Sequence, residues 1–162
     1  MNKAKYLIIS GGHKTLLDIE DFAWASVFRW QHSHGYACRR ERQPDGSYRK
    51  IYLHRLVAGA GKDKVTDHIN KDSLDNRRKN LRVCTHRQNL WNAKRPKNNT
   101  SGFKGVQWNK TERKWIARSE HNKRIYILGR YKTATEAARV YDAFVLSNRG
   151  EYAVTNFKAV TL

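Results

Sequence analysis

The chain has 162 residues and a formal net charge of +19, with 33 Lys and Arg against 14 Asp and Glu. Its composition is 39% hydrophobic and 11% aromatic, which is enough apolar surface for a folded core and excludes a disordered basic tail. This length allows one domain or two small ones, and the charge makes a polyanion such as nucleic acid the natural partner.

Neither membrane association nor a cysteine-based site is expected. The apolar run at residues 6–10 is far shorter than the ~20 residues that span a membrane and too short for a signal-peptide core. We therefore expect a cytoplasmic protein. Cys38 and Cys84 are too few for a disulfide framework or a four-cysteine zinc site, so both are expected to be small buried thiols.

The first 60 residues are expected to form a mixed α+β region. Residues 6–10, 36–40 and 48–53 alternate as strands do, and the turn signal Pro44-Asp45-Gly46 predicts a hairpin between the last two.

Two short helices are expected in the same region. An acidic cap at Asp18 opens the first, and His54 begins the second, which should end at Gly59. The expected buried face of the first helix consists of Ile19, Phe22, Ala23, Ser26 and Val27.

The next stretch predicts a hairpin followed by a helix. Residues 65–69 and 81–84 read as its two strands, joined by a polar loop at 70–80. Thr85 and Gln88 have the spacing of a capping box, which predicts a helix from His86 to about Ala93.

A domain boundary is expected after this helix. Pro96 and the polar residues around it cannot continue a helix, so residues 94–100 are predicted to be a basic linker between domains at 1–93 and 101–162.

Beyond the linker the sequence predicts an antiparallel meander packed on one helix. The helix should begin at the capping box formed by Thr133 and Glu136 and end at Gly150, with small alanines on its inner face. The expected strands are residues 103–108, 114–119 and 124–128.

The residues in the predicted hairpin and helix at 65–93 have the chemistry of a one-metal phosphodiesterase. Hydrolysis of a phosphodiester needs an activated water, neutralisation of transition-state charge and help for the leaving oxygen. A neutral imidazole such as that of His68 can activate the water. Asp67 and Asn89 offer one charged and one neutral oxygen, which suit a hard cation such as Mg²⁺ that keeps open positions for phosphate.

This arrangement resembles the HNH nucleases with a ββα-metal fold, in particular phage and intron-borne homing endonucleases in which asparagine replaces the last histidine. The resemblance covers residues 54–93, with Asn80-Leu-Arg-Val-Cys-Thr and Gln88-Asn-Leu-Trp-Asn matching the second strand and the helix. It implies that Asp67 and Asn89 bind the metal, that His68 is the general base, and that Asn80 holds the hairpin loop. It also implies a bacterial or phage-infected cell.

Simpler interpretations remain for these residues. Asp67 and His68 could be an ordinary strand pair, and Asn89 a surface amide. Neighbouring residues of a regular strand face opposite sides, so a shared site requires the strand to end or distort at His68. His54 could pack beneath the site or take part in it, and His86 could contact phosphate or the metal or be a solvated first-turn residue. The remaining histidines lack ligand spacing, which disfavours zinc.

Residues 101–157 resemble the DNA-binding domain of plant ethylene-response factors. The matching blocks include Ser101-Gly-Phe-Lys-Gly-Val-Gln-Trp, Lys-Trp-Ile-Ala-Arg and Thr-Glu-Ala-Ala-Arg-Val-Tyr-Asp. In that family the sheet lies in the major groove. Block-by-block matching implies that the DNA-facing residues are Lys104, Gln107, Asn109, Lys114 and Arg118.

The third strand departs from that family because it is one residue longer before Leu128-Gly129. A bulge there decides whether Arg124 and Tyr126 or Ile125 and Ile127 face the DNA. We expect the polar pair to do so.

Together these patterns predict a metal-dependent DNA endonuclease of HNH homing type, monomeric and nicking one strand of double-stranded DNA. The alternative is a DNA-binding transcriptional regulator whose nuclease site is inert. An RNA-binding or RNA-cleaving protein is a further alternative, since aromatic residues lie between the cations.

Overall fold

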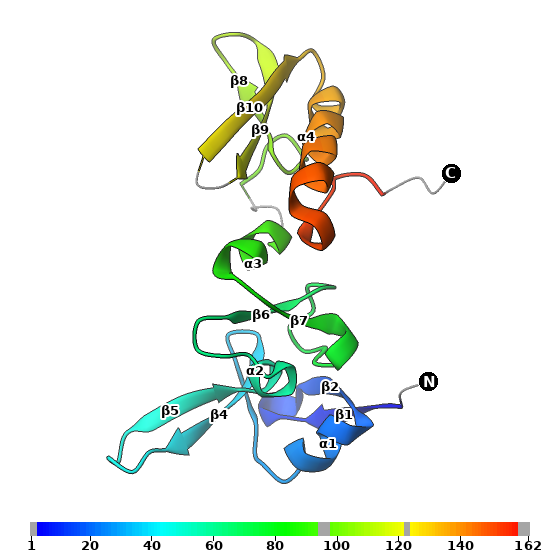
Figure 1. Cartoon of the computed structure of the whole chain (residues 1–162). Helices are drawn as coiled ribbons and strands as arrows, with labels where there is room; N and C mark the ends of the chain where they lie inside the picture. Colours follow the sequence, from blue (N-terminus) through cyan, green and yellow to red (C-terminus); the bar gives the residue numbers. More distant parts are fainter. Residues whose placement is uncertain (1–2, 94–97, 122–123, 159–162) are drawn as a thin grey trace. The chain divides into compact units, whose positions relative to one another are not determined.

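The computed structural model describes residues 3–93, 98–121 and 124–158, and the chain divides into two compact units at Met1–Asn89 and Leu90–Leu162. Both combine antiparallel strands with helices (Figure 1). This confirms the expected α+β class. The boundary lies at Asn89/Leu90, inside the helix that was expected to close the first domain, and residues 94–97 of the expected linker lie outside the described residues.

The N-terminal unit begins with a hairpin and a helix. Strand β1 (Ala4–Ile8) pairs with β2 (Lys14–Asp18) through a short 3₁₀ turn, and α1 (Ile19–Ala25) follows directly. The sequence did not predict β2. The expected buried face of α1 was also wrong, because the helix ends at Ala25 and the Val27 side chain beyond it is 75% exposed.

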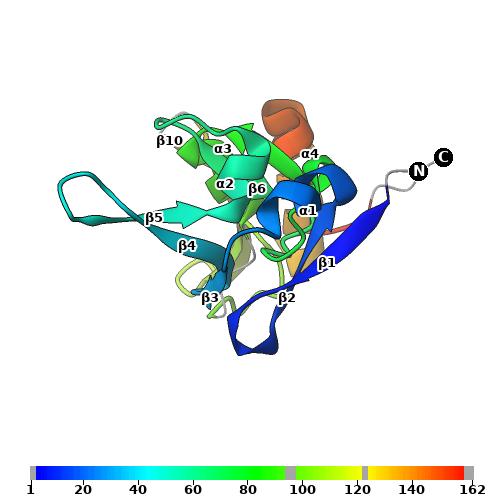
Figure 2. The same ribbon diagram turned by 90° about the horizontal axis from the view of Figure 1, so that it is seen from below.

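A three-stranded sheet and a second helix come next. The sheet consists of β3 (Gln31–Ser33), β4 (Tyr36–Arg42) and β5 (Tyr48–Tyr52) in that order. The β4–β5 hairpin with its turn at Gly46 was predicted correctly, and Figure 2 shows it reaching away from the rest of the unit. Helix α2 (Leu53–Ala58) ends at Gly59, whose φ of 63° is the left-handed conformation that glycine favours.

The last elements of this unit are β6 (Val65–His68), β7 (Leu81–Cys84) and α3 (His86–Asn92). The capping box predicted at the start of α3 is present, since the Gln88 amide N–H donates to Thr85 Oγ1 and the Thr85 amide donates to Gln88 Oε1. A two-stranded sheet and a helix therefore follow each other along the chain, as predicted.

A compact apolar core supports these elements. It combines side chains from β2, α1, β4, α2 and β7, including the fully buried Leu17 and Leu53. Cys38 and Cys84 are free and buried, which confirms the expectation for both thiols.

The C-terminal unit is a three-stranded meander with one long helix. The strands are β8 (Val106–Asn109), β9 (Lys114–His121) and β10 (Arg124–Tyr131), in the order β10-β9-β8. Helix α4 (Ala134–Arg149) packs on this sheet (Figure 1) and starts at the predicted capping box of Thr133 and Glu136. Ala137, Ala138 and Val145 bring the helix close to the sheet because they are small and fully buried.

Candidate functional site

Asp67 and His68 are the last two residues of β6, and both side chains are buried. The strand ends at His68, although His68 still pairs with Leu81 across the ladder. The Asp67 carboxylate is near enough to His68 to favour the protonated imidazole. Asp67 and His68 are thus buried side by side at the end of one strand, with the pairing of both to β7 intact.

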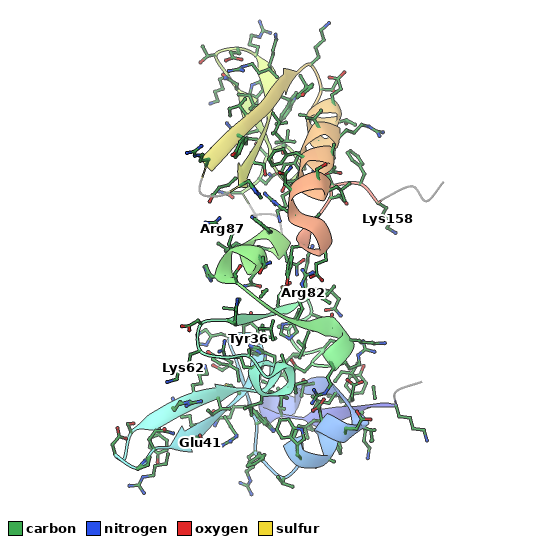
Figure 3. The ribbon with its side chains drawn as sticks, in the orientation of Figure 1. Tyr36, Glu41, Lys62, Arg82, Arg87 and Lys158 are labelled. Carbon is green, nitrogen blue, oxygen red and sulfur yellow. The ribbon has the colours of Figure 1, made fainter. Side chains whose placement is uncertain are left out.

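Asp67 forms an ion pair with Arg82, its cross-strand partner on β7. The guanidinium donates from Nε and Nη2 to Oδ2 of Asp67, at 2.8 Å in each case. Arg82, which Figure 3 labels on β7, is itself largely buried, so this charge pair is shielded from solvent. Arg82 was not among the site residues predicted from the sequence.

The His68 imidazole is held through its Nε2 atom, which lies 3.0 Å from Oδ1 of Asn76. Burial lowers the pKa of His68 below its usual value of 6.5, and the hydrogen bond to Asn76 and the nearby carboxylates oppose this shift without reversing it. His68 is therefore neutral at pH 7, which is the form that can accept a proton.

His54 of α2 lies beneath His68 in a cage of rings. The two imidazole centroids are 5.2 Å apart, and Tyr36 and Tyr52 lie 5.0 and 5.4 Å from His54. Burial lowers the pKa of His54 to about 3, and the neighbouring His68 and Arg55 act in the same direction. His54 is therefore neutral and packs beneath the site, as one of the two sequence interpretations proposed.

Asn80 ties together both ends of the β6–β7 loop. Its Oδ1 accepts from the Asn70 amide at 3.0 Å, and its Nδ2 donates to the Asp75 carbonyl at 2.7 Å. The Asp75 side chain in turn receives two hydrogen bonds from the Arg77 guanidinium. Asn80 therefore holds the loop that follows His68, while its importance for cleavage stays a prediction.

Asn89 lies one turn into α3, where its amide donates to the Thr85 carbonyl at 3.1 Å. Burial and then the Asp67 charge raise the pKa of the Cys84 thiol, and a hydrogen bond with the Asn89 backbone lowers it. Asp67 and the backbone of Asn89 therefore both lie near Cys84. His86, also on α3, is exposed, as expected for a first-turn residue.

The side chains of Asp67 and Asn89 carry oxygen donors, the ligand type that a hard divalent cation prefers. A carboxylate has two oxygens and about four lone-pair positions, so the Asp67–Arg82 pair does not exhaust its capacity. An amide oxygen from Asn89 would add a second hard ligand. No cluster of three or more His, Cys, Asp or Glu side chains suited to a metal occurs among the described residues.

The second candidate surface is the face of the β8–β9–β10 sheet that points away from α4. Residues opposite one another in an antiparallel ladder share a face, and successive residues alternate. Val106 and Ala117 are paired and belong to the core beneath α4, so the residues next to them face outward. On β8 and β9 the outward residues include Gln107, Asn109, Lys114 and Arg118. Arg118 Nη1 donates to Gln107 Oε1 at 3.1 Å.

The third strand contains the predicted bulge, because its register shifts between Ile127 and Gly129. The prediction for its two faces was wrong. Tyr126 pairs with Ser119 and its ring lies 5.7 Å from Phe144 of α4, which puts Tyr126 on the helix side. Alternation places Arg124 on the same side.

Ile125 and Ile127 therefore occupy the outward face, with 60% and 50% of their surface exposed. The physical reason is that the extra residue in the bulge reverses the in-out alternation of the residues before it.

Two other residues from the predicted DNA face have structural partners. Lys104 precedes β8, and its Nζ donates to the carbonyls of Trp91 and Ala93 at the end of α3, so it does not belong to the outward sheet face. Asn109 accepts from the Thr111 and Glu112 amides through Oδ1 and thereby shapes the β8–β9 turn.

The sequence did not point to Arg82, to Asn76, which bonds His68, or to Thr15, whose hydroxyl accepts from Asn76. Arg82 follows from the register of β6 and β7 once the hairpin is aligned, since it lies directly across from Asp67. Thr15 and Asn76 have no spacing signal, because they are 61 residues apart and meet only in the folded chain.

Part of the chain is similar to a phage protein. The chain is 45% identical over 49 residues to "Protein 3.8" of Escherichia phage T7, an alignment that spans 30% of this chain and 40% of that protein. No protein-family model matches the chain, and no solved structure matches it. None of the helices in the described part of the chain has the length and apolar character that a membrane crossing needs.

Proposed function

We propose that the protein is a divalent-metal-dependent endonuclease of HNH type that acts on double-stranded DNA. The observation that carries this proposal is the succession of β6, β7 and α3, with Asp67 and a buried, neutral His68 at the end of the first strand and Asn89 on the helix. The match to a phage protein is compatible with this assignment.

Each residue of the candidate site has its own role in the proposed reaction. His68 accepts the proton of the attacking water, because its imidazole is neutral at pH 7. Asp67 and Asn89 are the proposed ligands for Mg²⁺, which when bound supplies positive charge to the scissile phosphate and its leaving oxygen. Asn80 keeps the loop after His68 in place.

The C-terminal unit is the proposed DNA-binding part of the molecule. Residues 90–162 contain 15 Lys and Arg against 5 Asp and Glu. The outward sheet face offers Gln107, Lys114 and Arg118 for phosphates and base edges, and the isoleucines of β10 for apolar contacts. We further propose that the protein acts as a monomer and nicks one strand, since the described part of one chain supplies one such site.

A plasmid-nicking assay tests the enzymatic part of this proposal. The wild-type chain should convert supercoiled plasmid to the nicked form with Mg²⁺ and not with a chelator. His68→Ala should lose about 10²–10⁴-fold in rate, the usual contribution of a general base, while still retarding DNA in a gel. His34→Ala, at an exposed position, is the matched histidine control. A wild-type chain that binds DNA but cuts none of it with any divalent cation would overturn the proposal.

The second candidate is a DNA-binding regulator with an inert nuclease site, and the Asp67–Arg82 pair favours it. A buried guanidinium on the proposed metal ligand already supplies a positive charge at that position. In that case divalent cations should leave both the DNA affinity and the thermal stability of the chain unchanged.

A further inference from the structure

A chain of buried hydrogen bonds connects strand β2 to the imidazole of His68. Thr15 and Asn76 are both completely inaccessible to solvent, and His68 is 6% exposed. The Thr15 hydroxyl lies 2.8 Å from the Leu74 carbonyl, Asn76 Nδ2 lies 2.7 Å from Thr15 Oγ1, and Asn76 Oδ1 lies 3.0 Å from His68 Nε2.

The direction of all three hydrogen bonds is fixed by the first one, which joins the Thr15 hydroxyl to the Leu74 carbonyl. A backbone carbonyl only accepts, so the Thr15 hydroxyl must donate to Leu74. The Thr15 oxygen then accepts from the amide nitrogen of Asn76. This leaves the Asn76 oxygen facing His68, and an amide oxygen can only accept. The proton of the neutral imidazole therefore lies on Nε2, and the lone pair lies on Nδ1.

The backbone around Asn76 holds the amide in this orientation. Leu16 of β2 donates its amide to the Leu74 carbonyl and accepts from the Asn76 amide, both at 2.8 Å. β2 and the 69–80 loop are thus joined at Leu16, the residue next to Thr15. Rotating the Asn76 amide by half a turn would set its oxygen against Thr15 Oγ1 and its NH₂ against His68, and a mismatched polar contact inside a protein costs about 1–3 kcal/mol.

We propose that Asn76, oriented by Thr15, is a positioning residue that fixes the Nε2–H tautomer of His68 and so makes Nδ1 the atom that accepts a proton. The tautomer is a property of the folded chain whether or not it cuts DNA. Its catalytic consequence rests on the proposed nuclease function.

The tautomer can be measured directly by two-bond ¹H–¹⁵N correlation spectra of the full chain with ¹⁵N-labelled histidine. The two ring nitrogens of a neutral imidazole have clearly different shifts, and His68→Gln identifies the His68 signals among the seven histidines. At pH 8, wild-type His68 should show the Nε2–H form. A predominantly Nδ1–H form would overturn the inference.

Variants separate positioning from simple packing. Thr15→Val keeps the shape of the side chain but removes the acceptor for Asn76 Nδ2, so the amide is free to turn and His68 should become a mixture of tautomers. Asn76→Asp should retain Nε2–H, because a carboxylate accepts from that position, whereas Asn76→Leu should lose it. Thr66→Val is the matched control on β6, since Thr66 Oγ1 is buried and has no hydrogen-bond partner among the residues that the structure describes. An unchanged tautomer in both Thr15→Val and Asn76→Leu would overturn the positioning role.

Cleavage measurements on the same variants test the catalytic consequence separately. Relative to the wild type, Asn76→Leu should lose a large part of the about 10²–10⁴-fold supplied by a general base, and Asn76→Asp should regain much of it. If the variants change the tautomer as expected while the wild type cuts no DNA, that result would contradict the proposed function but not the assignment of the proton to Nε2. Equal cutting by folded Asn76→Leu and Asn76→Asp would overturn the role of Asn76 in catalysis.

Discussion

The imidazole rings of His54 and His68 meet edge to face, with their planes at 71° and their centroids 5.2 Å apart. Neither ring can readily take up a proton in this position, because burial disfavours the charged form of both. The pair therefore connects the candidate site to the stability of the N-terminal unit.

Acid should destabilise the protein through His54. Its pKa is about 3 in the folded state against 6.5 for the free side chain, so the unfolded chain binds more protons between these values. The contribution of His54 is fully present above pH 6.5 and is lost as the pH falls toward 3. Within this window the slope is up to about 1.4 kcal/mol per pH unit for one proton.

Urea unfolding at several pH values between 7 and 4 measures this slope. His54→Phe preserves an aromatic ring in the cage of Tyr36 and Tyr52 but cannot be protonated, so the free energy of unfolding should depend less on pH in the variant. His68 remains in the variant and retains its own share of the slope. His34→Gln, at an exposed position, controls for the loss of a histidine. A slope identical to that of the wild type would contradict the assignment to His54.

Arg82→Leu should destabilise the chain and make it more responsive to divalent cations. Breaking a buried ion pair from one side costs about 3–5 kcal/mol, because the Asp67 carboxylate is left buried without its cation. A bound divalent cation would replace that charge, so added Mg²⁺ or Mn²⁺ should raise the melting temperature more in the variant than in the wild type.

The control for Arg82→Leu is the double variant with Asp67→Asn. Removing the carboxylate charge as well should recover part of the lost stability and abolish the extra effect of the cation. If divalent cations stabilise the wild type, Arg82→Leu and the double variant equally, then Asp67 is not a metal ligand.

Gly105→Ala should destabilise the C-terminal unit. Gly105 has a φ of +76°, and an added Cβ would overlap the ring of Tyr141, which is buried against the sheet. A left-handed conformation and a tight overlap in a core together cost about 2–4 kcal/mol. Gly46→Ala is the control, because Gly46 has a similar φ of +83° but open space around it. Thermal unfolding should show a clearly smaller loss for Gly46→Ala, and equal losses would argue against the Tyr141 contact.

Signals within a few residues of each other predicted much of this fold. The capping boxes at Thr85 and Thr133 each begin a helix, and Gly59 ends one. These features depend on local backbone conformation, which local sequence determines. The positions of Asp67 and His68 on a strand could be predicted in the same way, because residues 65–69 have the composition of a strand.

The features that sequence could not supply depend on contacts between distant segments. Thr15 meets Asn76 only because β2 bonds to the loop after β6. The faces of β10 depend on a single extra residue, since a bulge at Leu128 decides whether Tyr126 or Ile127 faces outward. Polarity alone pointed to Tyr126, but the ring of Phe144 offers it a partner on the helix side.

Two arginines on opposite sides of the sheet can show whether the outward face binds DNA. Arg118 lies on the outward face beside Gln107, whereas Arg124 lies on the helix side, and both are exposed. If the outward face binds DNA, Arg118→Ala should raise the dissociation constant and lower the salt dependence of binding by about 0.9 in log–log slope for one lost phosphate contact. Arg124→Ala removes the same charge and serves as the matched control. Fluorescence anisotropy with duplex DNA at several salt concentrations measures both quantities, and a larger effect of Arg124→Ala would mean that DNA does not bind this face.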